Sequence, residues 1–220
     1  MTTDIQNGVP NAEERRQSMN ADAGTPPAHR LFEQPWPDGD FRFFQLGHVV
    51  DDVLAAASRW ASTFGIGPFH VLPVLEQQAT YGDEMRSLQI QVAVAQAGPL
   101  QIELIQQHCS TPSIFREWSN NGTSAFHQIA TVTDHYDEKK AHFETLGYHV
   151  VAESDAGEFR VAYVDTSVDF GFYTEVVENH LGFLTRLQAI SDTCASWNGI
   201  DPVRIMTRDG YRVPDGPKVR

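Results

Sequence analysis

The stretch that decides the fold is Phe44-Gln-Leu-Gly-His48-Val-Val-Asp-Asp52, which leads into a run that ends at Phe64-Gly65. A similar stretch stands in the second half, Phe126-His127-Gln-Ile-Ala-Thr-Val-Thr-Asp134, and leads into a run that ends at Leu146-Gly147. Each is an apolar strand followed by an aspartate that can cap a helix, because its side-chain oxygen accepts unpaired N–H groups of the first turn. The repetition predicts two copies of one module.

Each copy continues with strand-like segments after its helix. They are expected at about 68–75, 85–95 and 99–107 in the first copy, and at about 148–153, 158–164 and 170–178 in the second. The run Leu88-Gln-Ile-Gln-Val-Ala-Val94 alternates apolar and polar residues, which is typical of a strand with one wet face. Each copy therefore predicts a β-α-β-β-β unit.

The chain divides into four parts on this pattern. We expect a flexible arm over residues 1–40, the first module over 41–119, the second module over 120–179, and a C-terminal helix and tail over 180–220. The predicted fold class is α+β, with the two modules forming a curled mixed sheet around a metal-binding cavity.

The amino-acid composition excludes several classes of partner and function. The 220 residues carry a formal net charge of -13, which argues against a nucleic-acid partner because phosphate binding needs a basic face. No apolar stretch approaches the length that spans a bilayer, and no signal peptide is evident at the N-terminus, so we expect a cytoplasmic protein without a membrane partner. The two cysteines, Cys109 and Cys194, predict neither a disulfide framework nor a zinc pattern.

Two histidines and two glutamates recur in one order: His48 then Glu103, and His127 then Glu175. The histidines lie on the first strand of each module and the glutamates on the last, so a curled sheet can bring them together on its concave face. An ionised glutamate on a buried strand is costly unless its charge is compensated, and a divalent cation does so most economically. Zn, Ni, Co, Mn, Mg and Fe all suit two imidazoles and two carboxylates. A metal there can stabilise an enolate, with Glu175 or Glu103 exchanging the proton on the adjacent carbon.

The walls of such a pocket are less sharply indicated. One methionine and several aromatic strand residues are candidates to line it, although aromatic residues on strands more often belong to an ordinary core. The candidates are Phe69, Tyr81, Met85, Phe126, Tyr163 and Tyr173. Arg86 and Arg160 are candidates to bind a substrate carboxylate or phosphate, or are simply exposed strand arginines.

These residues together resemble the vicinal-oxygen-chelate superfamily of glyoxalases, bleomycin-resistance proteins and extradiol dioxygenases, and the glyoxalase-like branch near methylmalonyl-CoA epimerase in particular. The resemblance covers roughly residues 43–178. It implies paired β-α-β-β-β modules and one divalent metal held by His48, Glu103, His127 and Glu175. In this family the metal typically activates a substrate through vicinal oxygens. We also expect a small-molecule substrate and a homodimer.

The chain departs from the epimerase branch at one position. That branch carries a glutamate base entering the third strand of the first module, and by counting back from Glu103 we place Ser87 there. We therefore expect a metal-dependent isomerase, epimerase or lyase acting next to a carbonyl, rather than methylmalonyl-CoA epimerase itself. The alternatives are an extradiol-type ring-cleaving dioxygenase, which uses two histidines and one carboxylate on ferrous iron, and a non-catalytic small-ligand-binding protein of the resistance type.

Overall fold

The computed structural model describes residues 41–118, 124–155 and 158–215. The described residues form one compact unit. The arm predicted over residues 1–40 lies outside the described residues.

The first module follows the predicted order of strand, helix and strands. Its elements are β1 (Arg42–Val49), α2 (Val53–Phe64), β2 (Phe69–Val71), β3 (Leu75–Tyr81), β4 (Glu84–Ala97), β5 (Leu100–Gln107) and the short α3 (Ile114–Trp118). Asp52 caps α2 through its side chain, which accepts from the N–H of Ala55 at 2.9 Å, and Gly65 ends the helix in the left-handed region at φ 67°. The strand predicted at 68–75 is divided into β2 and the start of β3, because Pro73 lies between them and has no N–H for the ladder.

The second module repeats the plan and a C-terminal segment follows it. The elements are β6 (Ala125–Thr133), α4 (Tyr136–Thr145), β7 (Val150–Asp155), β8 (Arg160–Val164), α5 (Ser167–Phe170), β9 (Tyr173–Glu178), α6 (Leu181–Ala195), β10 (Val203–Thr207) and β11 (Gly210–Arg212). The last two were predicted as tail. They form a hairpin whose first strand pairs in parallel with β2, so the sheet supplies the backbone partners that the tail's own sequence does not indicate.

The strands of both modules close into a ring. Their order is β4-β3-β7-β8-β9-β6-β1-β5, and the pairing of β4 with β5 completes the circle. The first strand of each module pairs in parallel with the last strand of the same module, and β1 pairs antiparallel with β6 across the modules. The interior of this barrel is therefore lined by both modules of one chain.

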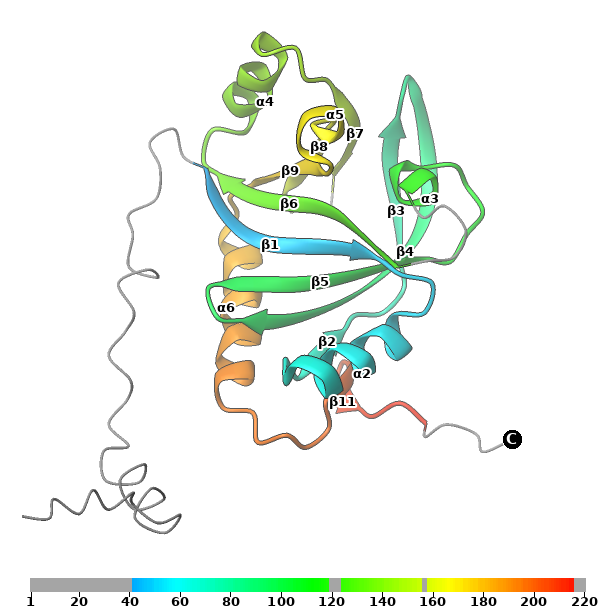
Figure 1. Ribbon diagram of the computed structural model, residues 1–220, viewed down its shortest axis with the longest axis vertical. Coiled ribbons are helices and arrows are strands. Elements are labelled where there is room, and N and C mark those ends of the chain that lie inside the picture. The colour runs from blue at the N-terminus through cyan, green and yellow to red at the C-terminus, as the bar shows by residue number, and fades with distance from the viewer. Residues whose placement is uncertain (1–40, 119–123, 156–157, 216–220) are drawn as a thin grey trace, which may run out of the picture. The chain divides into compact units, whose positions relative to one another are not determined.

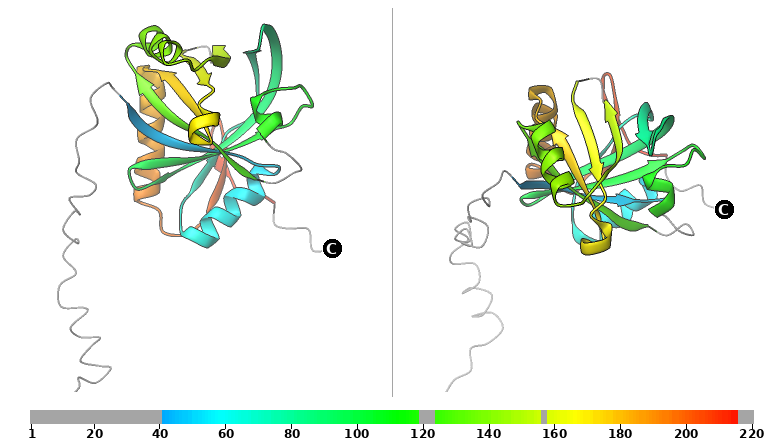
Figure 2. Two further views of the ribbon diagram at one scale, coloured as in Figure 1. Left: turned by 45° about the horizontal axis from the view of Figure 1, so that its top comes forward. Right: turned by 90° about the horizontal axis from the view of Figure 1, so that it is seen from above.

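Helices α2 and α4 cover the outside of the barrel. One apolar core lies between α2 and the outer face of the first module and includes Val53, Ala57 and Leu104, all at most 1% exposed. A smaller core lies under α4. Figure 1 shows α2 and α4 at opposite ends of this unit and α6 passing behind β1 and β5. Figure 2 shows the strands curling around a common axis in two further views. The α+β fold of two β-α-β-β-β modules, predicted from the sequence, is confirmed.

Alternation along the strands decides which side chains face the interior. On β5, Ile102 and Leu104 pack in the core under α2, so Glu103 and Ile105 face inward. On β9, Val176 packs under α4, so Glu175 and Val177 face inward. The last strand of each module thus presents one glutamate to the barrel interior.

Candidate active site in the barrel

Glu103 and Glu175 meet at the side chain of Gln128, which none of the sequence patterns above singled out. The Nε2 of Gln128 donates to Oε2 of Glu103 at 3.1 Å and to Oε2 of Glu175 at 3.2 Å. The hydroxyl of Tyr163 donates to the other oxygen of Glu175 at 3.2 Å. Gln128 is fully buried and Glu175 is 7% exposed. The two predicted glutamates are therefore brought together, with an amide as the bridge.

The strand register assigns a second glutamine to the same centre. Gln45 stands two residues before Gly47, the residue of β1 that pairs with Glu103. Gln128 likewise stands two residues before Ala130, the residue of β6 that pairs with Glu175. Gln45 also pairs with Ala130 across the modules and lines the same cavity as both glutamates. The equivalent positions of the two modules are thus Gln45 with Glu103 and Gln128 with Glu175.

Gly47 provides the space that Gln128 occupies. A Cβ atom on Gly47 would lie 2.4 Å from Cδ of Gln128 and 2.5 Å from its Nε2, which is closer than real side chains approach. The amide of Gln128 therefore reaches the two glutamates by crossing directly over the backbone of β1. Glycine at residue 47 is a requirement of the site.

His127 lies beside this centre without reaching the glutamates. The pairing of β1 with β6 is irregular here: Gly47 pairs with Gln128 and His48 with Phe126, which leaves His127 as the extra residue of a bulge. Its ring packs among aromatic side chains, with centroids 5.0 to 6.1 Å away, from Phe115, Trp118, Tyr163 and Tyr173. Its Nδ1 is hydrogen-bonded to Oε1 of Gln128. The predicted ligand is therefore a partner of the bridging amide.

His48 lies on the opposite side of the sheet. Its ring stacks at 5.2 Å from Trp60 of α2 and at 5.4 Å from Phe126. Because side chains alternate along β1 and Gln45 and Gly47 face inward, His48 faces outward. The structure therefore corrects the prediction that His48, Glu103, His127 and Glu175 converge: the glutamates do, and the histidines do not join them.

The donor atoms at the centre decide which metal the residues fit. Within residues 41–118, 124–155 and 158–215, no three His, Cys, Asp or Glu side chains are grouped to hold a metal ion. The two carboxylates lie beside the amide of Gln128, and Gln45 lies on the same cavity wall. Carboxylate and amide oxygens suit a hard cation such as Mg or Mn better than the imidazole-binding Zn, Ni or Fe. Gln128 can present either amide atom, since half a turn of its amide points Oε1 at the centre and Nε2 at Nδ1 of His127. The residues present fit a hard divalent cation.

Burial raises the proton affinity of the carboxyl pair. It raises the pKa of Glu103 well above its usual value, and the charge of Glu175 adds to this rise. Burial also raises the pKa of Glu175 to about 7, against the lowering effect of the hydrogen bonds from Gln128 and Tyr163. In the absence of a cation, one carboxyl therefore holds a proton while the other is ionised near neutral pH.

Two neighbouring groups keep fixed protonation states beside this pair. Burial lowers the pKa of His127 to about 4, against the hydrogen bond to Gln128, so its ring is neutral at pH 7. Burial, followed by the charges of Glu175 and Glu103, raises the pKa of Tyr163 well above its usual value. The Tyr163 hydroxyl therefore stays a hydrogen-bond donor.

The centre opens into a cavity of about 500 Å³ inside the barrel. Glu103, Glu175, Tyr163 and Gln45 lie in its wall, and side chains of α6 line another side. None of the five predicted substrate-binding residues, Phe69, Arg86, Phe126, Arg160 and Tyr173, is among the residues that line it.

Each of these five has another partner. Phe69 is buried in the core under α2, and Phe126 stacks on His48 and Phe172. Arg86 is paired with Glu84 at 2.7 Å. Arg160 is bonded to Asp137 and Glu178. Tyr173 packs against His127 and Trp118. Strand position alone therefore did not predict which side chains line the cavity, because packing partners far apart in the chain decide it.

The sequence contains a pattern that could have identified Gln45 and Gln128 as residues of the site. Aligned on the aspartate that ends each strand, Gln45-Leu-Gly-His-Val-Val-Asp51 matches Gln128-Ile-Ala-Thr-Val-Thr-Asp134 residue by residue. In this alignment the two glutamines coincide and the two histidines do not. Aligning on the histidines, which are the commoner metal ligands, obscured it.

Comparison with known proteins places residues 44–163, more than half of the chain, in the family described as the glyoxalase/bleomycin resistance protein/dioxygenase superfamily. Similar solved structures include methylmalonyl-CoA epimerase from Mycobacterium tuberculosis, with 15% identity and a TM-score of 0.49 over 69% of this chain and 97% of that one. A Streptomyces coelicolor methylmalonyl-CoA epimerase variant in complex with 2-nitronate-propionyl-CoA has 17% identity and a TM-score of 0.45 over 64% of this chain and 96% of that one. Such distant likenesses specify no reaction. No curated protein matches the chain.

Proposed function

Because the chain belongs to the glyoxalase/bleomycin resistance protein/dioxygenase superfamily, we propose that it is an isomerase, epimerase or lyase that moves a proton at a carbon next to a carbonyl. One observation carries this proposal: Glu103 and Glu175 face one cavity and share the amide of Gln128. Two carboxyls held together in an apolar site are suited to act as acid and base at neutral pH.

Glu175 is the base in this scheme. Its carboxylate takes the proton from the carbon next to the carbonyl, and the electron pair of the C–H bond moves to the carbonyl oxygen to form an enolate. Without a bound cation, Glu103 in its protonated form donates a hydrogen bond to that oxygen; with a cation bound, both glutamates would be ionised and the oxygen would be stabilised by the cation instead. Returning the proton to the carbon from Glu175 or from Glu103 restores the carbonyl and completes an isomerisation or epimerisation.

Gln45, Glu103, Gln128 and Glu175 are the residues that would hold a hard divalent cation. When bound, such a cation supplies a Lewis acid that polarises the carbonyl oxygen. Without a cation, Gln128 positions both glutamates through its Nε2, and its hydrogen bond to neutral His127 orients the amide. A cation would be held by its Oε1 after the half turn of the amide. Tyr163 holds the second oxygen of Glu175.

Solvent exchange tests the proposal directly. A panel of carbonyl compounds, from charged 2-oxo acids to neutral ketones, is incubated with the protein and Mg²⁺ or Mn²⁺ in D₂O, and deuterium on carbon is measured by mass spectrometry. We expect exchange into at least one class, lowered about a hundredfold or more by Glu175→Gln and by Glu103→Gln. Glu76→Gln, on the exposed edge of β3, serves as the control. Exchange unaffected by either active-site variant would remove the glutamates from the chemistry.

Of the two alternative functions, ring-cleaving dioxygenation is disfavoured and non-catalytic ligand binding is the stronger candidate. Ring-cleaving dioxygenase chemistry needs two imidazoles and one carboxylate on a single iron, and the outward position of His48 does not support it. Non-catalytic ligand binding is favoured by the largely apolar cavity wall. Tight ligand binding without exchange in any class of carbonyl compound would select that function instead.

A further inference from the structure

The cavity wall is mostly apolar and comes from both modules and from α6. Its apolar members are Leu72, Leu75, Ile90, Val92, Val94, Ile105, Phe115, Phe159, Val161, Val177, Phe183, Leu187 and Ile190. A volume of about 500 Å³ lies within the range of cavities that enclose most of the surface of a drug-sized ligand. Most of a ligand held here would therefore contact hydrocarbon.

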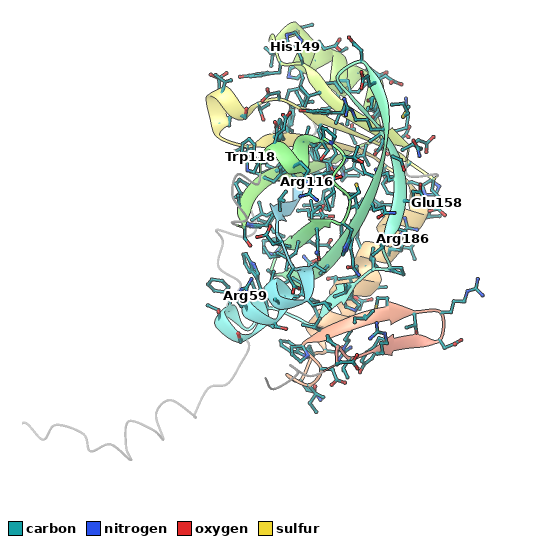
Figure 3. All side chains as sticks on the ribbon, turned by 90° about the vertical axis from the view of Figure 1, so that its right-hand side faces the viewer. Arg59, Arg116, Trp118, His149, Glu158 and Arg186 are labelled. Atoms are coloured by element: carbon teal, nitrogen blue, oxygen red, sulfur yellow. The ribbon has the colours of Figure 1, made fainter. Side chains whose placement is uncertain are left out.

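The charged groups on the wall are predominantly acidic. Glu103, Glu175 and Glu158 supply three carboxyl groups, and Arg186 supplies one guanidinium. Arg186 donates to Glu158 at 3.0 Å, and both side chains are about half exposed, which places this pair at the rim. Figure 3 shows the two side chains near one another at the edge of the molecule where α6 runs. Among the described residues that line the cavity, no basic side chain is left unpaired for an anionic ligand. Two ionised glutamates would balance the charge of a divalent cation held between them, so an anion gains no net positive partner there either.

Helix α6 supplies an apolar stripe to the cavity. Phe183, Leu187 and Ile190 stand at i, i+4 and i+7 and face it. Phe183 stacks on Phe159 at 4.7 Å and on Phe44 at 5.8 Å, which holds the start of the helix to the barrel. Yet no residue of α6 is fully buried. The apolar face of this helix thus covers a cavity rather than a packed core.

We propose that the substrate is a neutral, largely apolar carbonyl compound, with its hydrocarbon body against α6 and its carbonyl at Glu103 and Glu175. The proposal rests on the proposed proton-transfer function for the placement of the carbonyl, and on the cavity wall for the apolar body and the absence of charge. It excludes anionic thioesters, phosphate esters and dicarboxylates as preferred substrates.

Displacement of a fluorescent probe tests the selectivity. The neutral dye N-phenyl-1-naphthylamine is bound to the full-length protein at pH 8, and it is competed with 2-dodecanone or with dodecanoate, which differ mainly in charge. We expect the dye to gain fluorescence on binding and the ketone to displace it at concentrations at least tenfold lower than the carboxylate. Equal displacement, or stronger displacement by the carboxylate, overturns the proposal.

Matched variants of α6 tie the binding to this cavity. Ile190→Glu puts a carboxylate on the wall and is expected to weaken dye binding tenfold or more, whereas Leu181→Glu, at a position 79% exposed, binds the dye like the wild type. Leu187→Trp fills the cavity without adding charge and is expected to lower binding too, so a folding defect of one variant does not decide the result. Binding unchanged in both wall variants places the dye elsewhere and overturns the proposal.

The two proposals fail in different ways. Glu175→Gln is expected to retain dye binding, because the apolar side chains of the wall are unchanged, so it separates loss of exchange from loss of the apolar site. Ketone binding without deuterium exchange into any class of carbonyl compound contradicts the proton-transfer function and leaves the ligand class standing. Exchange into a charged 2-oxo acid, with no displacement of the dye by the ketone, supports the function and overturns the ligand class.

Discussion

At the scale of single residues, the site depends on Gln128 and on the glycine beneath it. The amide of Gln128 donates to both glutamates and accepts from His127, so its two ends connect the acidic pair to a neutral ring. Hydrogen bonds to charged groups contribute roughly 1.5–3 kcal/mol each. A side chain at residue 47 would occupy the space that the amide of Gln128 fills.

Gly47→Ala is expected to displace the Gln128 side chain and to lower the free energy of unfolding by about 1–3 kcal/mol, because the added methyl group overpacks the interior. Urea denaturation measures the loss. A double-mutant cycle with Gln128→Ala is the control: the alanine at residue 47 should cost much less once the amide is gone. Equal costs in both backgrounds would mean that the methyl group meets something other than Gln128.

The carboxyl pair predicts how stability depends on pH in protein freed of divalent cations. Because burial raises the folded-state pKa of Glu175 to about 7, against a usual value of 4.5, the folded protein binds more protons than the unfolded chain between these pH values. The contribution of the Glu175 carboxyl to the free energy of unfolding is therefore fully present below pH 4.5 and is lost as the pH rises through 7.

Glu175→Gln removes this titration. Relative to the wild type, the variant should become more stable by up to about 3 kcal/mol as the pH is raised from 4.5 to 8. Guanidinium denaturation at each pH measures the free energy of unfolding of both proteins. Their difference is compared, because the titration of buried histidines affects both proteins alike and cancels. A flat difference for Glu175→Gln would mean that Glu175 titrates normally.

At the scale of elements, helix α2 shows how local sequence starts and stops a segment. Asp52 accepts a hydrogen bond from the N–H of Ala55, and Gly65 takes the left-handed conformation that ends the helix. The apolar face of α2 then covers the outer side of β4 and β5. The side of β5 that carries Glu103 is thereby directed inward.

Replacement of the cap isolates the contribution of this helix. Asp52→Ala should lower the free energy of unfolding by about 1 kcal/mol, because one N–H of the first turn loses its acceptor. Asp51→Ala changes a neighbouring exposed aspartate that does not cap the helix, and should cost less. Thermal or urea denaturation compares the two. An equal loss in both variants would point to general charge effects rather than to capping.

At the scale of the whole molecule, closure of the barrel within one chain completes the site. The β1–β6 and β3–β7 pairings join the modules on two sides, and the four oxygen-bearing side chains come from β1, β5, β6 and β9 of the same chain. The homodimer expected from the sequence stays a prediction, and the centre does not need a partner subunit. No helix among the described residues is long and apolar enough to cross a bilayer.

Cation binding should follow this single-chain geometry. We expect the chain to bind about one Mn²⁺, measured by electron paramagnetic resonance of free Mn²⁺, with the same stoichiometry at any protein concentration. Gln128→Ala should weaken binding at least tenfold, whereas His48→Ala, which changes a ring on the outer face, should leave it unchanged. Loss of binding in His48→Ala and not in Gln128→Ala would restore the histidines as ligands.

The sequence by itself determined the two β-α-β-β-β modules, the capped helix α2 and the inward glutamates, because strand alternation, capping and helix periodicity are local properties read from neighbouring residues. It did not determine which residues complete the site. That choice depends on the bulge that makes His127 the extra residue of β6, on the register that makes Gln45 and Gln128 equivalent, and on the close approach of Gly47 to Gln128. Only the tertiary structure decided these, because each arises from the pairing of strands far apart in the chain. The cavity under α6 has the same origin, since its walls meet only when the barrel closes.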